Sequence, residues 1–339
     1  MSNIGKCRRA FYCTVGSSLY KTQLSPISLS KIFKSVGLSK LLYGAEIRHF
    51  SNVEINMYDQ FQRNMARDIQ RLPQNCPNPV VLATLGWRSI AYQIDLVKLG
   101  FGYRILASES DSIYRILFVK RLYYLLYVGE LTDISPVSQF ISVCRKYKLI
   151  NEVLGWILSG RIPSSGNWKK QCERAISDHD FSRWRLSLRM YRKLTDFRVI
   201  YTEIVMSGWW TIARYNVTLK KSCCTMIRLI SGCSQLKVDM DVHLAFDQRI
   251  CGLCPSGQVE DLFHILIDCT YYNDLRRSLF EKLECSLSQE TYTLIDSLPV
   301  RIVYYILMGM NYPISYHDLW KLRCISCQGV SQMYNRRIR

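Results

Sequence analysis

The sequence of 339 residues contains no uninterrupted apolar run long enough to cross a lipid bilayer. The best candidate, residues 113–129, is interrupted by Arg115, Lys120 and Arg121, so we expect no membrane-spanning helix. The sequence also lacks a glycine-rich phosphate loop and a Ser-His-Asp or Cys-His set of catalytic type. We therefore identify no catalytic residue from the sequence.

Acidic residues are scarce relative to basic ones. The chain has 27 Asp and Glu against 45 Lys and Arg, which gives a formal net charge of +18 at pH 7. Such an excess favours a polyanionic partner, because each phosphate that a cation neutralises releases counterions. We predict RNA or DNA as this partner, with an acidic membrane surface as the competing polyanion. The hydrophobic content of 48% is enough for a real core, so the chain is not a disordered basic tail.

Fourteen cysteines occur in the chain, and we recognise no N-terminal signal sequence ahead of them. Disulfides persist in oxidising compartments, so this combination favours free thiols in a reducing compartment. We expect a nuclear or cytoplasmic location.

Three of these cysteines and one histidine form a compact pattern with metal-ligand spacing. Cys251, Cys254, His264 and Cys269 follow the order Cys-x2-Cys-x9-His-x4-Cys. Zn²⁺ takes thiolate and imidazole in a tetrahedron, at about 2.3 Å for sulfur and about 2.0 Å for nitrogen. Because all four positions are filled by protein, the pattern predicts a structural zinc site rather than a catalytic one.

The same four residues could instead be unpaired thiols beside a buried histidine. We favour zinc because the ligands fall within nineteen residues, with turn-forming residues between them. We expect a helix to begin near Glu260 and Asp261, with His264 on it and Cys269 at its end. Asp268 or Glu260 is the expected partner of the second ring nitrogen of His264.

The periodicity of apolar residues predicts a mainly α-helical fold with, at most, a small hairpin at the zinc site. Ser51 and Glu54 form a capping-box signature ahead of an amphipathic helix that ends before Pro73. A further helix is predicted over residues 181–200. We divide the chain into three helical regions, which are 1–108, 109–214 and 215–339.

Basic residues recur at helical spacing in two places and also follow the zinc ligands. They are predicted to contact nucleic-acid phosphates, which carry no sequence information. The alternative for each stripe is a solvated helix face. The predicted contacts are Arg63, Arg67, Arg71, Arg185, Arg189, Arg192, Lys193, Arg276 and Arg277.

Several short blocks, in this order and spacing, resemble the C-terminal part of non-LTR (LINE-type) retrotransposon reverse transcriptases. The early blocks are similar to the end of the palm and the thumb, and the late ones to the CCHC zinc knuckle. The blocks are IGKCRRAF (4–11), LLYGAE (41–46), RLP (71–73), NP (78–79), LGW (85–87), RLISG (228–232) and the knuckle with its flanks (251–272).

The resemblance implies a helical thumb-like bundle in 1–108, a helical connector in 109–214 and a zinc-knuckle unit packed with helices in 215–339. It also implies that the helix bearing Arg63, Arg67 and Arg71 lies along template and primer. Arg48 departs from the Trp that usually follows the YGAE motif.

The polymerase chemistry of that family needs paired carboxylates that hold two divalent ions, and the chain contains no Asp-Asp dipeptide. Asp239-Met240-Asp241 lies far downstream of a palm position and is interpreted as a solvated turn. The resemblance therefore implies a non-catalytic, RNA- or DNA-binding portion of a reverse transcriptase, which is inactive alone and lacks the palm and nuclease sites. The alternative is a host-recruited zinc-containing module that binds another protein.

Overall fold

The computed structural model describes residues 2–16, 24–128 and 134–338, and it is mainly helical, as predicted. Within these residues no β-strand forms, and the only extended pairings are two isolated bridges, Leu85 with Met206 and Ile250 with Val259. The α-helices are α1 (Asn3–Val15), α2 (Pro26–Ile32), α3 (Leu38–Leu41), α4 (Asn52–Gln70), α5 (Asn78–Ala83), α6 (Ile90–Leu106), α7 (Ile113–Tyr127), α8 (Pro136–Lys146), α9 (Ile150–Ser159), α10 (Ser165–Arg189), α11 (Thr195–Ile200), α12 (Gly208–Tyr215), α13 (Lys220–Ile230), α14 (Lys237–Met240), α15 (Asn273–Ser286), α16 (Gln289–Asp296), α17 (Val300–Leu307) and α18 (Tyr316–Arg337). The short π- and 3₁₀-helices are η1 (Phe33–Gly37), η2 (Arg192–Leu194), η3 (Val217–Leu219), η4 (Phe246–Gln248), η5 (His264–Asp268) and η6 (Thr270–Tyr272).

The chain forms two compact units, and neither is continuous in sequence. The first unit comprises Met1–Ser17, Ile32–Arg63 and Arg88–Leu186. The second comprises Ser18–Lys31, Asn64–Trp87 and Ser187–Arg339. Three of the boundaries between the units fall inside α2, α4 and α10, and another falls at 87/88, whereas the sequence-based division places its boundaries at 108/109 and 214/215.

In the first unit, α4 begins with the predicted capping box. The Glu54 carboxylate accepts from the Ser51 backbone N–H at 3.0 Å, and the Glu54 N–H donates to Ser51 Oγ at 3.2 Å. These reciprocal bonds satisfy two of the backbone donors that a helix start leaves unpaired. The helix then buries Tyr58 and Phe61 on one face, and Phe50 packs edge-on against Tyr58.

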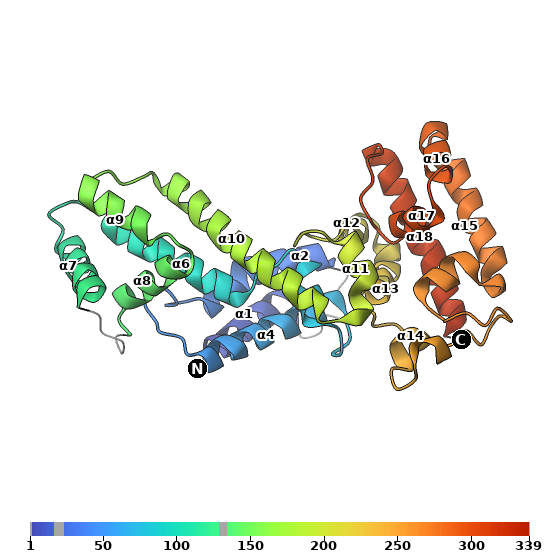
Figure 1. Ribbon diagram of the computed structural model, residues 1–339, viewed down its shortest axis with the longest axis horizontal. Helices are drawn as coiled ribbons and strands as arrows, with labels where there is room; N and C mark the ends of the chain where they lie inside the picture. Colours follow the sequence, from blue (N-terminus) through green and yellow to red (C-terminus); the bar gives the residue numbers. More distant parts are fainter. Residues whose placement is uncertain (1, 17–23, 129–133, 339) are drawn as a thin grey trace. The chain divides into compact units, whose positions relative to one another are not determined.

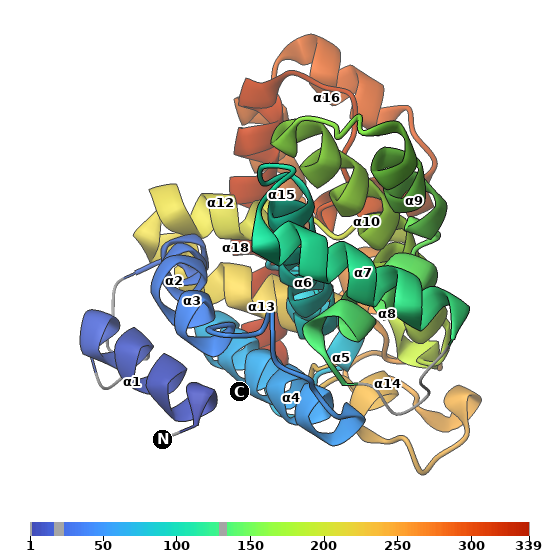
Figure 2. The same cartoon turned by 90° about the vertical axis from the view of Figure 1, so that its left-hand side faces the viewer.

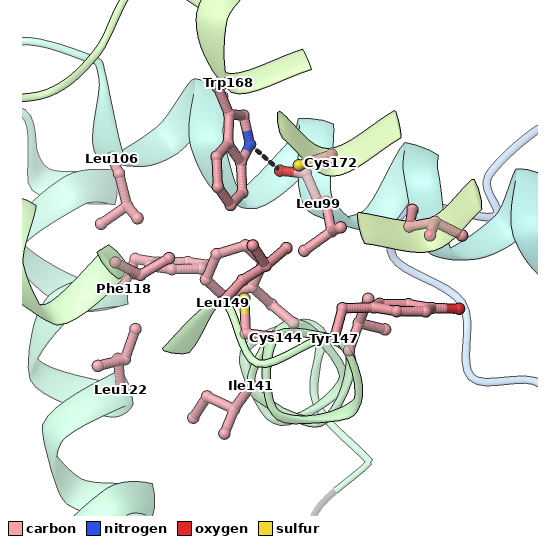
Figure 3. Packing of buried hydrophobic residues seen from close by; sticks show 14 of the residues in the cluster. Leu99, Leu106, Phe118, Leu122, Ile141, Cys144, Tyr147, Leu149, Trp168 and Cys172 are labelled. Atoms are coloured by element: carbon pink, nitrogen blue, oxygen red, sulfur yellow. Dashed lines mark hydrogen bonds between the residues drawn. The ribbon is translucent and has the colours of Figure 1, made fainter. Parts of the chain in front are cut away.

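The larger core of the first unit lies among α6, α7, α8, α9 and the first part of α10, which Figures 1 and 2 show gathered together. Apolar positions of each helix point into it, including Leu99, Leu122 and Cys144, all with no exposed surface. Figure 3 shows Trp168 over this cluster, with its indole N–H donating to the Leu99 carbonyl at 3.3 Å. The one polar atom of this large side chain is therefore satisfied inside the core.

Close packing in this core depends on a glycine of α6. A Cβ built on Gly102 would lie 2.3 Å from the ring of Phe140, which comes from α8 and is itself buried. Helices α6 and α8 approach each other at this point, and only a residue without a side chain leaves room for the ring.

The second unit is built around α13 and α18, which lie against each other and against α12 (Figure 1). A buried polar cluster joins this group to α4 and α5. The Gln70 side-chain oxygen accepts from the Trp210 indole at 3.1 Å and from the Thr84 hydroxyl at 2.6 Å, and its amide donates to the Val81 carbonyl at 2.7 Å. Residues from distant parts of the sequence are thus fixed in one satisfied network.

A second polar cluster fixes the start of α18 beside α16. The Asp318 carboxylate accepts from the hydroxyls of Ser288 at 2.7 Å, Thr291 at 2.8 Å and Ser315 at 3.0 Å. These bonds hold the pKa of Asp318 below its ordinary value, with the Ser288 hydroxyl as the largest cause. The charge also lies in the first turn of α18, where a helix favours an anion.

The prediction of one helix over residues 181–200 is wrong. Helix α10 begins earlier and ends at Arg189, and Tyr191 has extended backbone angles, with φ −111° and ψ 106°. The chain then resumes in η2 and α11, where Leu194 and Phe197 are completely buried. Burial of these two side chains in the second unit requires the change of direction at Tyr191.

Candidate metal centre

The first two predicted ligands lie on a tight, hairpin-like turn. The Cys251 N–H donates to the Gln258 carbonyl at 2.8 Å, and the Glu260 N–H donates to the Arg249 carbonyl at 2.8 Å. Gly257 closes the turn with a φ of +64°, a left-handed conformation that glycine adopts at little cost. This is the small hairpin expected at the site, reduced to a single bridge between Ile250 and Val259.

The other two ligands come from a short helical segment, as predicted. The Asp261 carboxylate caps this segment by accepting from the His264 N–H at 2.7 Å. The segment then continues as the π-helical turn η5, in which the Cys269 N–H donates to the His264 carbonyl at 2.7 Å. A π turn spaces its bonded residues five apart, so it brings Cys269 back towards His264 although an α-helix would not align them.

All four predicted ligand atoms converge. The three Sγ atoms and one imidazole nitrogen lie within 4.8 Å of one another. Cys251 Sγ is 4.0 Å from Cys269 Sγ, and Cys254 Sγ is 3.3 Å from His264 Nε2. A tetrahedron with zinc–sulfur bonds of about 2.3 Å has sulfur–sulfur edges of about 3.8 Å. The cluster therefore has the dimensions of a tetrahedral metal site.

Burial distinguishes the four ligands. Cys251, His264 and Cys269 are at most 3% exposed, whereas Cys254 is partly exposed. Burial raises the pKa of the Cys251 thiol, and it raises that of Cys269 to about 12. Burial, the largest single influence, opposes ionisation of Cys254, but hydrogen bonds from Ser256, Cys269 and His264 together outweigh it and lower the pKa of Cys254 to about 6. The site thus combines one thiol that ionises readily with two that need a cation to become thiolates.

The second nitrogen of His264 has a different partner from the one expected. Nδ1 lies 2.7 Å from the side-chain oxygen of Gln258, so an amide orients the ring and leaves Nε2 facing the cysteines. The predicted carboxylates are wrong, because Glu260 is paired with Arg337 and Asp268 is exposed. Sequence spacing could not identify Gln258, since the turn that brings it to the ring depends on the bridge between Ile250 and Val259.

This is the one group of three or more metal-binding side chains in residues 2–16, 24–128 and 134–338. The sequence contains a second Cys-x-x-Cys pair, Cys324 and Cys327. Cys327 lies beside another thiol, with its Sγ 3.6 Å from that of Cys223 in a fully buried contact. The structure thus provides no basis for a second metal centre in this part of the chain.

Two of the predicted phosphate contacts are structural. Arg67 is only 6% exposed, and its guanidinium donates to the Cys76 carbonyl at 3.1 Å and to Asn78 Oδ1 at 2.6 Å. Arg276 is partly buried and donates to the carbonyls of Leu266 at 2.8 Å and Cys269 at 2.7 Å. Both side chains tie the backbone together, because their donors are used inside the fold.

The remaining basic residues differ in exposure. Arg63 and Arg71 are partly exposed, and Arg71 lies beyond the end of α4 with a φ of +56°. The predicted stripe of Arg63, Arg67 and Arg71 is therefore not a continuous solvent-facing row. The exposed members of the predicted set are Arg185, Arg189, Arg192, Lys193 and Arg277.

Within the residues that the structure covers, no helix is both long enough and apolar enough to cross a membrane. In comparisons with family models, curated proteins and solved structures, none matches this chain.

Proposed function

We propose that Cys251, Cys254, His264 and Cys269 bind one structural zinc ion. The observation that carries this proposal is the convergence of three sulfur atoms and one imidazole nitrogen within 4.8 Å. Four protein ligands complete a tetrahedron and leave no position for water or substrate, so the ion would stabilise the fold and perform no chemistry. Gln258 would hold the imidazole in the orientation that the ion needs.

Metal analysis of the purified chain tests this proposal. We expect one equivalent of zinc in the wild type and loss of that zinc in Cys269→Ser, with chelation unfolding the region around the turn. Cys285→Ser is the matched control, because Cys285 is an exposed cysteine outside the cluster. A wild type that folds fully and contains no metal after preparation with zinc would contradict the assignment.

We further propose that the chain is a non-catalytic, nucleic-acid-binding portion of a LINE-type reverse transcriptase. Three features support this proposal: the resemblance of its sequence blocks, the net charge of +18 and the exposed basic residues of α10 and of the segment after Cys269. Contacts to phosphates would dominate, with little sequence preference. Catalysis would require a palm that carries the missing carboxylates. A nuclear or cytoplasmic location belongs to the same proposal.

Binding of RNA and DNA oligonucleotides at increasing salt concentration tests the nucleic-acid proposal. We expect the logarithm of the affinity to fall linearly with the logarithm of the salt concentration. The triple variant of Arg185→Gln, Arg189→Gln and Arg277→Gln should bind more weakly and have a shallower slope. For duplex DNA the slope should decrease by about 0.9 for each phosphate contact that is lost.

The control removes the same charge elsewhere, from the exposed residues Lys40, Lys221 and Lys282 by substitution with Gln. Equal losses of nucleic-acid affinity in both variants would mean that net charge alone drives binding. This result would contradict the assignment of Arg185, Arg189 and Arg277 as phosphate contacts. If the wild type binds neither RNA nor DNA, the protein-interaction alternative replaces the nucleic-acid proposal. A primer-extension assay should yield no product, and a product would contradict the non-catalytic assignment.

A further inference from the structure

The second unit contains a cleft of about 800 Å³ that the predicted contacts do not explain. Most of its lining residues come from two segments, 190–196 and 236–249, and Phe263 and Arg301 also line it. The cleft adjoins the metal centre without including any of the four ligands. Its volume lies within the range typical of ligand-binding sites in proteins.

The segment 236–249 exposes apolar side chains to solvent. Phe246 is 59% exposed and Val242 is 68% exposed. Arg249 fixes the loop from inside, since its guanidinium donates to the carbonyls of Val238 at 2.8 Å and Leu244 at 2.9 Å. These hydrogen bonds of Arg249 fix the backbone of the segment from which the Phe246 side chain lines the cleft.

The segment 190–196 gives the cleft basic lining residues. Arg192 and Lys193 are exposed, and the Arg192 side chain makes no hydrogen bond or ion pair to the described part of the chain. Lys193 Nζ donates once, to the Gly232 carbonyl at 2.9 Å, which positions the ammonium group at the cleft and leaves two of its donors. Two cations thus line the same cleft as the exposed ring of Phe246.

Arg301 adds a third cation, already placed on an aromatic ring. Its guanidinium carbon is 4.6 Å from the centroid of Phe263, and half of the side chain, 52%, is exposed. A guanidinium held in this way can stack on a base with its exposed side.

The acidic residues of the cleft are engaged by the fold. Asp196 accepts from the Tyr304 hydroxyl, Asp239 accepts from Ser234 and Asp261 caps the His264 segment. Their hydrogen bonds direct these carboxylates to protein partners. Asp196 Oδ1 also lies 4.0 Å from Arg301 Nη2 and so neutralises part of that charge, whereas Arg192 and Lys193 stay exposed.

From this combination we infer that the cleft binds a single-stranded segment of RNA or DNA, an inference that rests on the proposed nucleic-acid function. Phe246 and the exposed side of Arg301 stack on unpaired bases, and Arg192 and Lys193 bind the phosphates between them. A duplex does not fit this description, because its bases are already stacked on each other and only its backbone is available. Cationic grooves with exposed rings are typical of single-strand binding that tolerates many sequences.

Fluorescence anisotropy of the full chain with labelled 20-nucleotide oligo(U), oligo(dT) and a 20-base-pair duplex tests the inference. We expect Phe246→Ala to weaken binding of the single strands about 5-fold or more, since a stacked base is lost. Binding of the duplex should not change. Arg192→Gln should weaken binding of the single strands and reduce their salt dependence by about 0.7 in slope. Comparison of oligo(U) with oligo(dT) distinguishes RNA from DNA as the preferred strand.

Tyr316→Ala is the matched control, because Tyr316 is 76% exposed, belongs to the same unit and does not line the cleft. If Phe246→Ala and Arg192→Gln both bind single strands as the wild type does, the cleft inference is overturned while the nucleic-acid proposal stands. Equal weakening by Tyr316→Ala would also overturn it. Absence of any nucleic-acid binding by the wild type would overturn both.

Discussion

The carboxylate of Glu260, which has no exposed surface, is paired with the guanidinium of Arg337 near the end of α18. The neighbouring Arg336 makes a similar pair with Asp274, with both contacts at 2.7 Å, but the side chain of Asp274 is 62% exposed. Two adjacent arginines thus pair with carboxylates in very different surroundings. The first pair anchors the turn of the candidate metal centre to α18.

Loss of Arg337 should destabilise the protein more than loss of Arg336. In Arg337→Leu the buried Glu260 carboxylate remains without its partner, and we expect a loss of about 3 kcal/mol in the free energy of unfolding. Arg336→Leu should have little effect, because water solvates Asp274. Urea unfolding followed by circular dichroism measures both. Equal stability of the two variants would show that the buried pair does not hold the turn to α18.

Gln258 should affect metal affinity without being a ligand. In Gln258→Ala the Nδ1 atom of His264 loses the partner at 2.7 Å, so the ring is less well oriented. We expect zinc affinity to fall about 10- to 100-fold, as for other residues that orient metal ligands. Competition with a chromogenic chelator measures this affinity. Gln332→Ala, at an exposed position of α18, should bind zinc as the wild type does.

Two glycines of α6 should respond to the same substitution in opposite directions. Gly102→Ala places a methyl group against the Phe140 ring, and we expect a loss of about 1–3 kcal/mol from overpacking. Gly100→Ala meets no atom within 4 Å and should stabilise the helix by about 0.5–1 kcal/mol. Thermal and urea unfolding of both variants measure this difference. A neutral Gly102→Ala would mean that α6 and α8 are not in close contact.

The Asp318 cluster predicts a dependence of stability on pH. Its carboxyl pKa is lower in the folded state than the ordinary value of 3.8, so its stabilising contribution is complete above that value and is lost as pH falls below it. Asp318→Asn should cost about 1–3 kcal/mol at pH 7, because buried hydroxyl donors lose their charged acceptor.

Unfolding of the wild type and Asp318→Asn between pH 7 and pH 2 measures this contribution. The difference between the two proteins should shrink as the pH falls below about 4, when the carboxyl group of the wild type becomes protonated. Asp247→Asn, at an exposed loop position, should show no such convergence. A difference that stays constant down to pH 2 would contradict the assigned cause.

Local features of the fold could be predicted from the sequence. The four candidate ligands lie within nineteen residues, so one turn and one short helix determine their convergence. The capping box of Ser51 and Glu54 likewise depends on residues three apart. The helical spacing of apolar residues predicted the mainly helical fold, because most helices bury one apolar face.

Features that depend on long-range packing could not be predicted in this way. Arg67 occupies a basic position in a periodic stripe, yet its environment is set by Cys76 and Asn78 in the following loop. The break at Tyr191 depends on where Leu194 and Phe197 are buried, which no local signal indicates. The cleft also escaped prediction, since its walls come from residues about fifty positions apart in sequence.

The interleaving of the second unit has a practical consequence for dissecting the molecule. A protein beginning at residue 215 would keep the four candidate ligands but would lose Trp210 and Gln70, whose side chains bond to each other in the interior. Lys220 would also lose the carbonyl of Leu24, to which its ammonium group donates at 2.6 Å. A protein that begins at residue 215 would also lack nearly all of α12, which packs against α13. Point substitution is therefore a better way than truncation to study the candidate metal centre.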